Sequence, residues 1–305
     1  MRRGLALWMA VSAGLIGWVA AAAVIGEPRR ANAQATPPVE INRVQDAAFL
    51  PGENDRQIIT VLAIGSDARP GDDVASHLAD SLHLITVNPK KQAATILGFP
   101  RDSYVEIPGV GTRKINETLF SGGPEKVAET IEGLTGIPID YYLLTGFEGF
   151  KRMVSGIGGL EVHIPYAMND SSSGAVFGEG PAELDGAQAL AFTRNRKDTP
   201  NGDFSRSENQ GLILQAAQAK LRHEAIPTQA RLFQWIIVGV QNLETDMSIG
   251  ELFSLGLVAS SLDPLKVTNL VVPGSTGSAG DASVVFISDA AQDIYADIRD
   301  DGIIG

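Results

Sequence analysis

The chain has 305 residues and no cysteine, and it carries a net charge of −12 at pH 7, with 44% hydrophobic and 20% charged residues. This length and composition indicate a globular protein of one large domain or two small ones, and the lack of cysteine excludes disulfides, thiolate metal sites and cysteine nucleophiles. The acidic balance disfavours a nucleic-acid surface, because proteins that neutralise many phosphates present a broad basic face.

The amino terminus predicts export across a membrane. Residues 4–26 carry no charge, and roughly 20 apolar residues suffice to span a bilayer as a helix. Arg2 and Arg3 precede this run, so the positive-inside bias keeps the amino terminus in the cytoplasm and the rest of the chain outside. We therefore expect a transmembrane anchor at residues 1–26. The alternative is a signal peptide cleaved near Ala33, where "ANA" fits a cleavage site.

Residues 27–55 are rich in Pro, Ala and polar residues, which is typical of a linker. From residue 56 to the end, patterns of strands and helices alternate. The expected strands are 57–65, 82–89, 93–99, 140–147, 160–165 and 266–273. The expected helices are 124–136, 148–159, 185–194, 205–221, 229–243, 249–262 and a last one near 286–299. Residues 171–180 indicate a loop or hairpin tip. This alternation predicts one α/β domain over residues 56–305, built on one main sheet.

Charged residues stand where three of the predicted strands begin or end. Ligands of α/β sheets bind at strand ends, where loops converge, although any single stretch of this kind is also typical of a solvated turn. The residues concerned are Asp67, Arg69, Asp80, Arg101 and Asp102.

A further cluster lies in "FTRNRKDTPNGDFSR", residues 192–206, where Arg194, Arg196 and Arg206 surround Asp198 and Asp203. The planar guanidinium group binds phosphate oxygens in pairs. Spaced aspartates, without Cys or His at metal-ligand spacing, suit a hard cation such as Mg²⁺ or Mn²⁺. Arginines, a hard cation and carboxylates together are the groups that phosphoryl transfer requires.

Six motifs between about residues 57 and 222 resemble the LytR-CpsA-Psr family, and their order and spacing make the resemblance specific. They are "LAIGSDAR", "ADSLHLITVNP", "GFPRDSYVEIPG", "KINETLFSGG", "TIEGLTGIPIDYYLLTGFEGFKRMVSGIGGLEVHIP" and "LDGAQALAFTRNRKDTPNGDFSRSENQ". The resemblance implies an enzyme at the outer face of a bacterial membrane, which moves a glycopolymer from a polyprenyl-pyrophosphate carrier onto peptidoglycan. The polymer would be teichoic acid, capsule or arabinogalactan. The implied fold is an α/β/α sandwich with one main mixed sheet and an apolar groove for the polyprenyl tail, following a single transmembrane helix.

The resemblance also implies roles for individual residues. Asp67 and Asp80 match the acids associated with Mg²⁺, and Asp203 matches a carboxylate that assists catalysis. Lys114 and Asn116 match a K-I/L-N motif whose role stays open, and we place Lys114 with the pyrophosphate ligands. Catalysis is expected to involve Asp203, Arg101, Arg194 and Arg196. The expected pyrophosphate-binding set is Arg69, Arg101, Arg194, Arg196, Arg206, Gln210 and Lys114.

The sequence departs from the family pattern at Leu78 and Asn209, where arginine is usual. Loss of an arginine that faces the pyrophosphate could slow the chemistry, alter the donor or leave a binding protein. His77 could partly replace the arginine missing at Leu78, although an exposed loop histidine is the expected interpretation. Two further functions stay open. One is a pyrophosphatase on lipid carriers, with water as acceptor, because the motifs do not encode the acceptor. The other is a non-catalytic lipid-pyrophosphate-binding wall protein.

Overall fold

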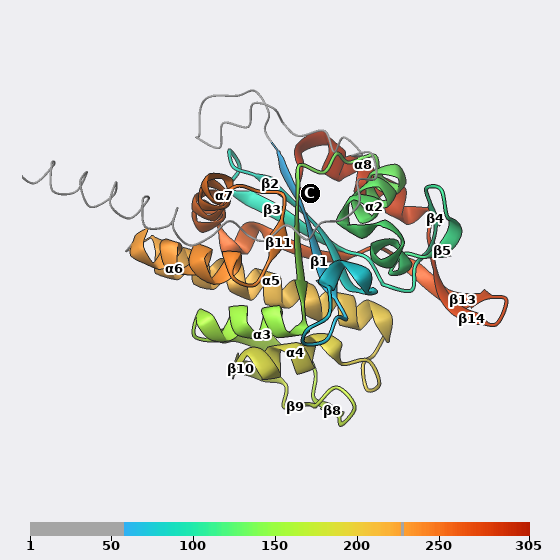
Figure 1. Cartoon of the computed structure of the whole chain (residues 1–305), viewed down its shortest axis with the longest axis horizontal. Coiled ribbons are helices and arrows are strands. Elements are labelled where there is room, and N and C mark those ends of the chain that lie inside the picture. The colour runs from blue at the N-terminus through green and yellow to red at the C-terminus, as the bar shows by residue number, and fades with distance from the viewer. Residues whose placement is uncertain (1–57, 227–228) are drawn as a thin grey trace, which may run out of the picture. The chain divides into compact units, whose positions relative to one another are not determined.

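The computed structural model describes residues 58–226 and 229–305, and Figure 1 shows how their helices and strands are arranged. The predicted anchor at residues 1–26, the predicted linker at residues 27–55 and the first two residues of the predicted domain lie outside these residues. Within the described part of the chain, no helix is both long and apolar enough to cross a membrane.

In the described residues, six strands form a mixed main sheet in the order β11-β6-β1-β2-β3-β12. The pairs β1–β6 and β3–β12 are parallel and the other neighbours are antiparallel. This confirms the predicted α/β class with one main mixed sheet. The strands are β1 (Ile59–Ser66), β2 (Ala79–Asn88), β3 (Ala93–Gly98), β6 (Tyr141–Gly146), β11 (Glu244–Thr245) and β12 (Val267–Val271).

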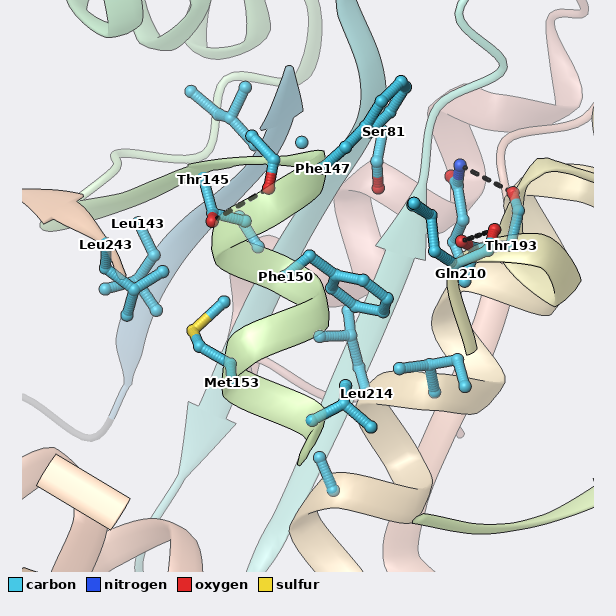
Figure 2. Close-up of a pocket in the computed structure, with 18 of the residues that line it drawn as sticks. Ser81, Leu143, Thr145, Phe147, Phe150, Met153, Thr193, Gln210, Leu214 and Leu243 are labelled. Atoms are coloured by element: carbon cyan, nitrogen blue, oxygen red, sulfur yellow. Dashed lines mark hydrogen bonds between the residues drawn. The ribbon is translucent and has the colours of Figure 1, made fainter. Parts of the chain in front are cut away.

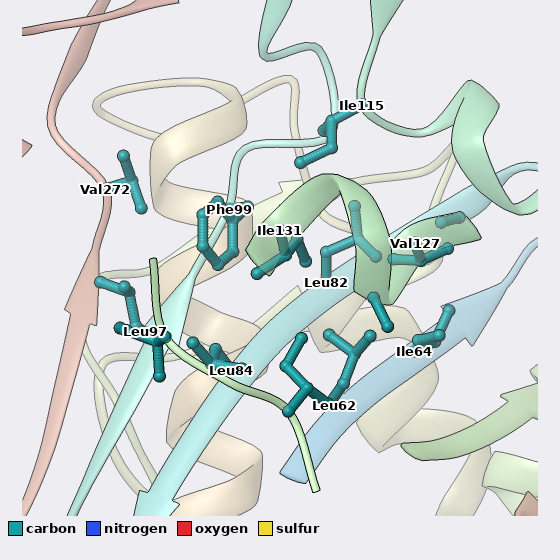
Figure 3. Close-up of a cluster of buried hydrophobic side chains, with 14 of the residues drawn as sticks. Leu62, Ile64, Leu82, Leu84, Leu97, Phe99, Ile115, Val127, Ile131 and Val272 are labelled. Carbon is teal, nitrogen blue, oxygen red and sulfur yellow. The ribbon is translucent and has the colours of Figure 1, made fainter. Parts of the chain in front are cut away.

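Helices cover both faces of the sheet (Figure 1). Side chains alternate between the two faces along each strand, so Leu62, Leu84 and Leu97 share one face (Figure 3). They pack with α2 (Glu117–Thr135) and α8 (Ala290–Asp301). On the other face, Val87 and Ile96 pack against α5 and α7. The helices of this second layer are α3 (Phe147–Gly156), α4 (Gly186–Arg194), α5 (Asp203–Ala225), α6 (Gln229–Val240) and α7 (Ile249–Ser261).

Some boundaries differ from the sequence-based expectation. Helix α2 begins at Glu117 rather than at Pro124, and it kinks at Gly122 and Gly123. The last helix begins at Ala290, because residues up to Ile287 belong to β14. The predicted hairpin tip is confirmed at residues 171–174. The strands that pair outside the main sheet are β4 (Tyr104–Ile107) with β5 (Gly111–Lys114), β7 (Leu160–Ile164) with β10 (Gly180–Leu184), β8 (Met168–Asp170) with β9 (Ala175–Phe177), and β13 (Gly274–Ala279) with β14 (Ala282–Ile287).

The topology gathers the predicted charged residues at one edge of the main sheet. Strands β1, β3 and β6 run in the same direction, so their carboxyl ends meet there, next to the start of the antiparallel β2. Ser66 at the end of β1 stands opposite Ala79 at the start of β2. Strand ends of this kind are where α/β proteins bind ligands.

Candidate functional site

An apolar cavity of about 370 Å³ lies between the sheet and helices α3, α4, α5 and α6. Leu143 from β6, Phe150 and Met153 from α3, and Leu214 from α5 line it, as Figure 2 shows. Trp235 from α6 also lines the cavity. A space with such a lining takes up an apolar chain far more readily than water.

A charged pocket of about 440 Å³ opens at the sheet edge, and it is lined by Asp67, Arg69, His77, Asp80, Arg101, Phe147 and Arg194. Asp80, Phe147 and Arg194 line the apolar cavity as well. The two spaces are therefore adjacent, with one aspartate, one arginine and one phenylalanine where they meet.

The Arg101 guanidinium forms an ion pair with the Asp80 carboxylate. Burial lowers the pKa of Arg101, but the charges of Asp80, Asp102 and Asp203 outweigh this effect and raise the pKa above its ordinary value. Gln210, predicted as a pyrophosphate ligand, donates from Nε2 to the backbone oxygens of Asp80 at 3.0 Å and Thr193 at 3.3 Å. In this structure Gln210 therefore ties β2 to α4.

Arg206 and Asp203 form an ion pair in the first turn of α5, with side chains only 5% and 6% exposed. Burial lowers the pKa of Arg206, and the Asp203 carboxylate opposes that effect. The second oxygen of Asp203 accepts the backbone N–H of Asp102 at 3.4 Å. Neither side chain is among the residues that line the charged pocket in this structure, and Asp203 lies beside it against the Asp102 backbone.

Arg194 and Arg196 take different partners. Side chains two positions apart project to the same side only where the backbone is extended. Arg194, however, is the last residue of helix α4. Its guanidinium lies over the Phe147 ring, 4.6 Å from the ring centroid. The Arg196 guanidinium is 3.9 Å from an Asp102 carboxylate oxygen. The other oxygen of Asp102 accepts from Lys114 Nζ at 3.0 Å, so Lys114 is the direct partner of Asp102.

The departure at Leu78 leaves Asp67 well anchored. Leu78 N–H donates to Asp67 Oδ1 at 3.0 Å, and Asp67 N–H donates to the Leu78 carbonyl at 3.0 Å. His77 lines the charged pocket. Its Nε2 is 3.2 Å from Asp72 Oδ2 and its Nδ1 is 3.7 Å from Asp67 Oδ1, so it is not merely an exposed loop histidine. Asn209, the other departure, is buried and donates to the Tyr166 hydroxyl at 3.1 Å.

Asp67 and Asp80 are the two predicted metal ligands, and both line the charged pocket. Among the described residues, no group of three or more His, Cys, Asp or Glu side chains is arranged to hold a metal. Mg²⁺ usually takes one or two carboxylates and completes its shell with phosphate oxygens and water. The aspartate pair therefore fits a hard cation that binds together with a phosphorylated ligand.

Sequence reasoning missed some features of the site. Phe147 lines both spaces and lies under Arg194. It also begins α3, whose N-cap Gly146 gives the helix no side-chain cap, so the first N–H groups of α3 lie beside the pocket. The sequence did carry a signal for Phe147, because it stands where an apolar strand passes into a helix at the same sheet edge.

His83 is one of the residues that line the apolar cavity, and it is fully buried. Its Nε2 contacts the Ser207 carbonyl and its Nδ1 contacts Ser81 Oγ, both at 3.1 Å. Because a carbonyl only accepts, Nε2 carries the proton and Ser81 donates to Nδ1.

Comparison with known proteins gives consistent matches. The model of the LytR_cpsA_psr family matches residues 25–297. The polyisoprenyl-teichoic acid–peptidoglycan teichoic acid transferase TagU of Bacillus licheniformis is 40% identical over 157 residues, which is 51% of this chain and 50% of that protein. TagU of Bacillus cereus is 33% identical over 249 residues, covering 79% of this chain and 78% of that protein. The chain spans about half the length of the first curated relatives it matches.

Solved structures share the fold. The structure of B. subtilis TagV superposes with a TM-score of 0.70 at 27% identity, covering 81% of this chain and 97% of that one. A structure of TagT bound to LI-WTA gives a TM-score of 0.66 at 25% identity, covering 83% of this chain and 95% of that one.

Proposed function

Because this chain belongs to the LytR-CpsA-Psr family, we propose that it transfers a glycopolymer from a polyprenyl-pyrophosphate carrier to peptidoglycan. The observation that carries this proposal is the apolar cavity that adjoins a charged pocket at Asp80, Phe147 and Arg194. A polyprenyl pyrophosphate has a long apolar chain joined to a compact anionic head. The two adjacent spaces match these two parts in the same order.

The polyprenyl chain would occupy the apolar cavity. Removing the chain from water is worth about 0.8 kcal/mol per CH₂ group, so the lining of Leu143, Phe150, Met153 and Leu214 would supply most of the donor's affinity. A groove for the lipid tail is thus the natural use of this space.

The pyrophosphate would occupy the charged pocket. Arg69, Arg101 and Arg194 line it and offer charge-assisted hydrogen bonds to phosphate oxygens. Arg196 and Lys114 converge on Asp102 beside it, and the buried Arg206 adds positive charge behind Arg101. In this arrangement the carboxylates hold the arginines in place while the pocket is empty of substrate.

Asp67 and Asp80 would hold the Mg²⁺ or Mn²⁺ ion. When bound, such a cation neutralises charge that builds up on the phosphate oxygens. Asp80 already forms an ion pair with Arg101. Its one carboxylate would therefore both orient the arginine and bind the cation.

The proposed reaction is a phosphoryl transfer. An acceptor hydroxyl oxygen bonds to the phosphorus that carries the glycopolymer, the bond from that phosphorus to the bridging oxygen breaks, and polyprenyl phosphate leaves. The hydroxyl proton must pass to a base, and we assign this role to Asp203. Because Asp203 is buried and paired with Arg206, most of the rate should come from charge stabilisation by the arginines.

We also propose that the chain is anchored by residues 1–26, with residues 57–305 outside the membrane. The charge asymmetry around the apolar run supports this topology. Protease added to intact spheroplasts should then digest residues 57–305, and full protection would overturn the topology.

A labelled lipid-linked glycopolymer tests the activity. Full-length protein in detergent is mixed with this donor and Mg²⁺, with and without peptidoglycan. A transferase moves label into peptidoglycan. A pyrophosphatase releases label equally well without the acceptor, and a binding protein retains the donor unchanged, so either of these results contradicts the proposal.

A further inference from the structure

A polar pocket of about 300 Å³ borders the site, and the reaction described above leaves it unused. Residues 68–74, the start of α3 and the turn between α6 and β11 form its walls. Arg69 lines both this pocket and the charged pocket. Thr145, Gly146 and Leu243 line both this pocket and the apolar cavity. We call it the Arg152 pocket, after the α3 residue in its wall.

The lining of the Arg152 pocket mixes hydrogen-bond donors with acceptors. Arg152 donates from Nε to Asn242 Oδ1 at 2.6 Å, and a guanidinium carries five N–H donors, so this contact uses one of them. Carboxylates of Asp72, Glu148 and Glu244 line the same space. Glu244 is partly desolvated there, and burial, together with the charge of Asp73, raises its pKa.

The walls of the pocket are held in place. Thr145 Oγ1 donates to the Asn242 carbonyl at 2.8 Å, which fastens the α6–β11 turn to the end of β6. Gly149 allows this close approach, since a Cβ there would lie 2.7 Å from the same carbonyl oxygen. A binding site of fixed shape loses less entropy when its ligand binds.

This chemistry suits a sugar better than the parts of the donor already placed. Several carboxylates disfavour a further phosphate, and the polar lining disfavours a lipid chain. Neighbouring hydroxyl and amide groups require hydrogen-bond donors and acceptors close together, and the arginine and the carboxylates of this pocket supply them. The volume of the pocket is at the lower end for small-ligand sites.

We propose that the Arg152 pocket binds one sugar residue of a substrate, with Arg152 and Glu244 contacting its hydroxyl or amide groups. This inference rests on the proposed function, because it takes the lipid and the pyrophosphate to fill the neighbouring spaces. The sugar belongs either to the peptidoglycan acceptor or to the donor glycopolymer, next to its pyrophosphate. The chemistry is the same for both, and kinetics separate them.

The test uses the full-length protein in detergent, with a lipid-linked oligosaccharide as donor and a soluble peptidoglycan tetrasaccharide as acceptor. The variants are Arg152→Ala and Glu244→Gln. Matched controls are Arg231→Ala, an exposed helix arginine on α6, and Glu183→Gln, an exposed strand glutamate on β10. Each KM is measured with the other substrate saturating, and thermal unfolding confirms that every variant is folded.

Loss of one charge-assisted hydrogen bond should raise one KM at least about 10-fold, with kcat within about twofold and both controls like wild type. A rise in the acceptor KM assigns the sugar to peptidoglycan, and a rise in the donor KM assigns it to the glycopolymer. Unchanged KM values in an active, folded Arg152→Ala protein would overturn the inference while leaving the transferase function intact.

If the wild-type protein shows no transfer at all, calorimetric titration with the tetrasaccharide and with the free donor oligosaccharide still decides. Binding of either that Arg152→Ala weakens supports the sugar pocket even though the proposed function has failed. No binding of either oligosaccharide by the wild-type protein rejects it.

Discussion

Arg194 and Arg196 are two positions apart, and both should matter for the reaction, whereas Lys197 should not. Arg194 lines the charged pocket and Arg196 faces Asp102 beside it. Lys197 instead contacts the Ser172 hydroxyl in an exposed loop. Replacing either arginine by alanine should cost roughly 2–4 kcal/mol of transition-state stabilisation, or about 30- to 1,000-fold in rate. Steady-state transfer assays measure this loss.

Lys197→Ala is the control for these variants, with activity expected near that of the wild type. Melting temperatures of the two arginine variants should also stay close to wild type, because both side chains are exposed and surface pairs contribute little stability. If both arginine variants kept full activity while Lys197→Ala abolished it, the side of this segment that carries Lys197, and not the side with the two arginines, would face the substrate.

Asp203 can act as a base or as a partner of Arg206, and a double variant separates these roles. Asp203→Asn leaves a buried guanidinium without its carboxylate, so unfolding should become easier by about 3 kcal/mol. Adding Arg206→Met removes the stranded charge and should restore most of the stability, as chemical denaturation would show. If the carboxylate takes the proton, the stabilised double variant stays inactive. Recovery of full activity would assign Asp203 a positioning role only.

His83 should make folding stability depend on pH. Burial lowers its pKa to about 4, although its hydrogen bond to the Ser207 carbonyl works in the opposite direction. The unfolded histidine titrates near 6.5, so between about pH 6.5 and 4 the unfolded state binds a proton that the folded state excludes. Stability should therefore fall by about 3 kcal/mol as the pH drops through this range, with no effect above it.

Denaturation midpoints at pH 7 and pH 4.5 test the His83 prediction. His83→Gln should flatten that difference, whatever it does to stability at pH 7. His163→Gln, at an exposed position on β7, should keep the wild-type slope. A wild-type slope in His83→Gln would mean that other groups cause the acid sensitivity.

At the scale of elements, apolar patterning predicted the main sheet well and the small hairpins badly. β1 and β3 are runs of apolar and β-branched residues with a buried face, so their strands were evident. β5 reads GTRK and β13 reads GSTGSA, and neither shows the alternation that marks a strand. These segments become strands because β4 and β14 pair with them, a contact that the local sequence does not encode.

The candidate site divides in the same way. Motif spacing found residues that line the charged pocket, such as Asp67, Asp80 and Arg101. It could not show that Arg206 is buried, because burial depends on how α5 packs against the sheet. Nor could it show that Gln210 bonds backbone carbonyls. The Arg152 pocket is built from segments up to about 170 residues apart in sequence, so no single stretch revealed it.

The kink of α2 should depend on Gly123. This residue has φ 72° and ψ −170°, a conformation that is essentially restricted to glycine. Gly123→Ala should therefore destabilise the protein by about 1–3 kcal/mol. Gly133 lies in the same helix, and a Cβ added there would meet no atom within 4 Å, so Gly133→Ala should instead stabilise the protein by up to about 1 kcal/mol. Equal effects of the two substitutions, measured by urea denaturation, would contradict this account of the kink.

On the scale of the whole molecule, an acidic chain builds a positive site by bringing distant segments to one sheet edge. The chain has a net charge of −12, yet Arg69, Arg101 and Arg194 come from three separate segments and line one pocket. The surrounding acids limit repulsion among them, as the pairing of Asp80 with Arg101 shows. The apolar cavity lies on the inner side of this pocket, so the fold can separate lipid from charge within one site.

Because the lipid chain would have a cavity of its own, we expect the effect of a substitution in that cavity on KM to depend on the length of the donor's lipid chain. Ala217 on α5 lines the apolar cavity, and a phenylalanine there would fill part of the space. With each buried CH₂ worth about 0.8 kcal/mol, Ala217→Phe should raise the KM for a long polyprenyl donor at least about 10-fold. A donor with only two or three isoprene units does not reach as deep, so its KM should hardly change. Ala230→Phe, at an exposed position on α6, controls for the added ring. If Ala217→Phe affected both donors equally, or neither, the lipid chain would have to lie outside this cavity.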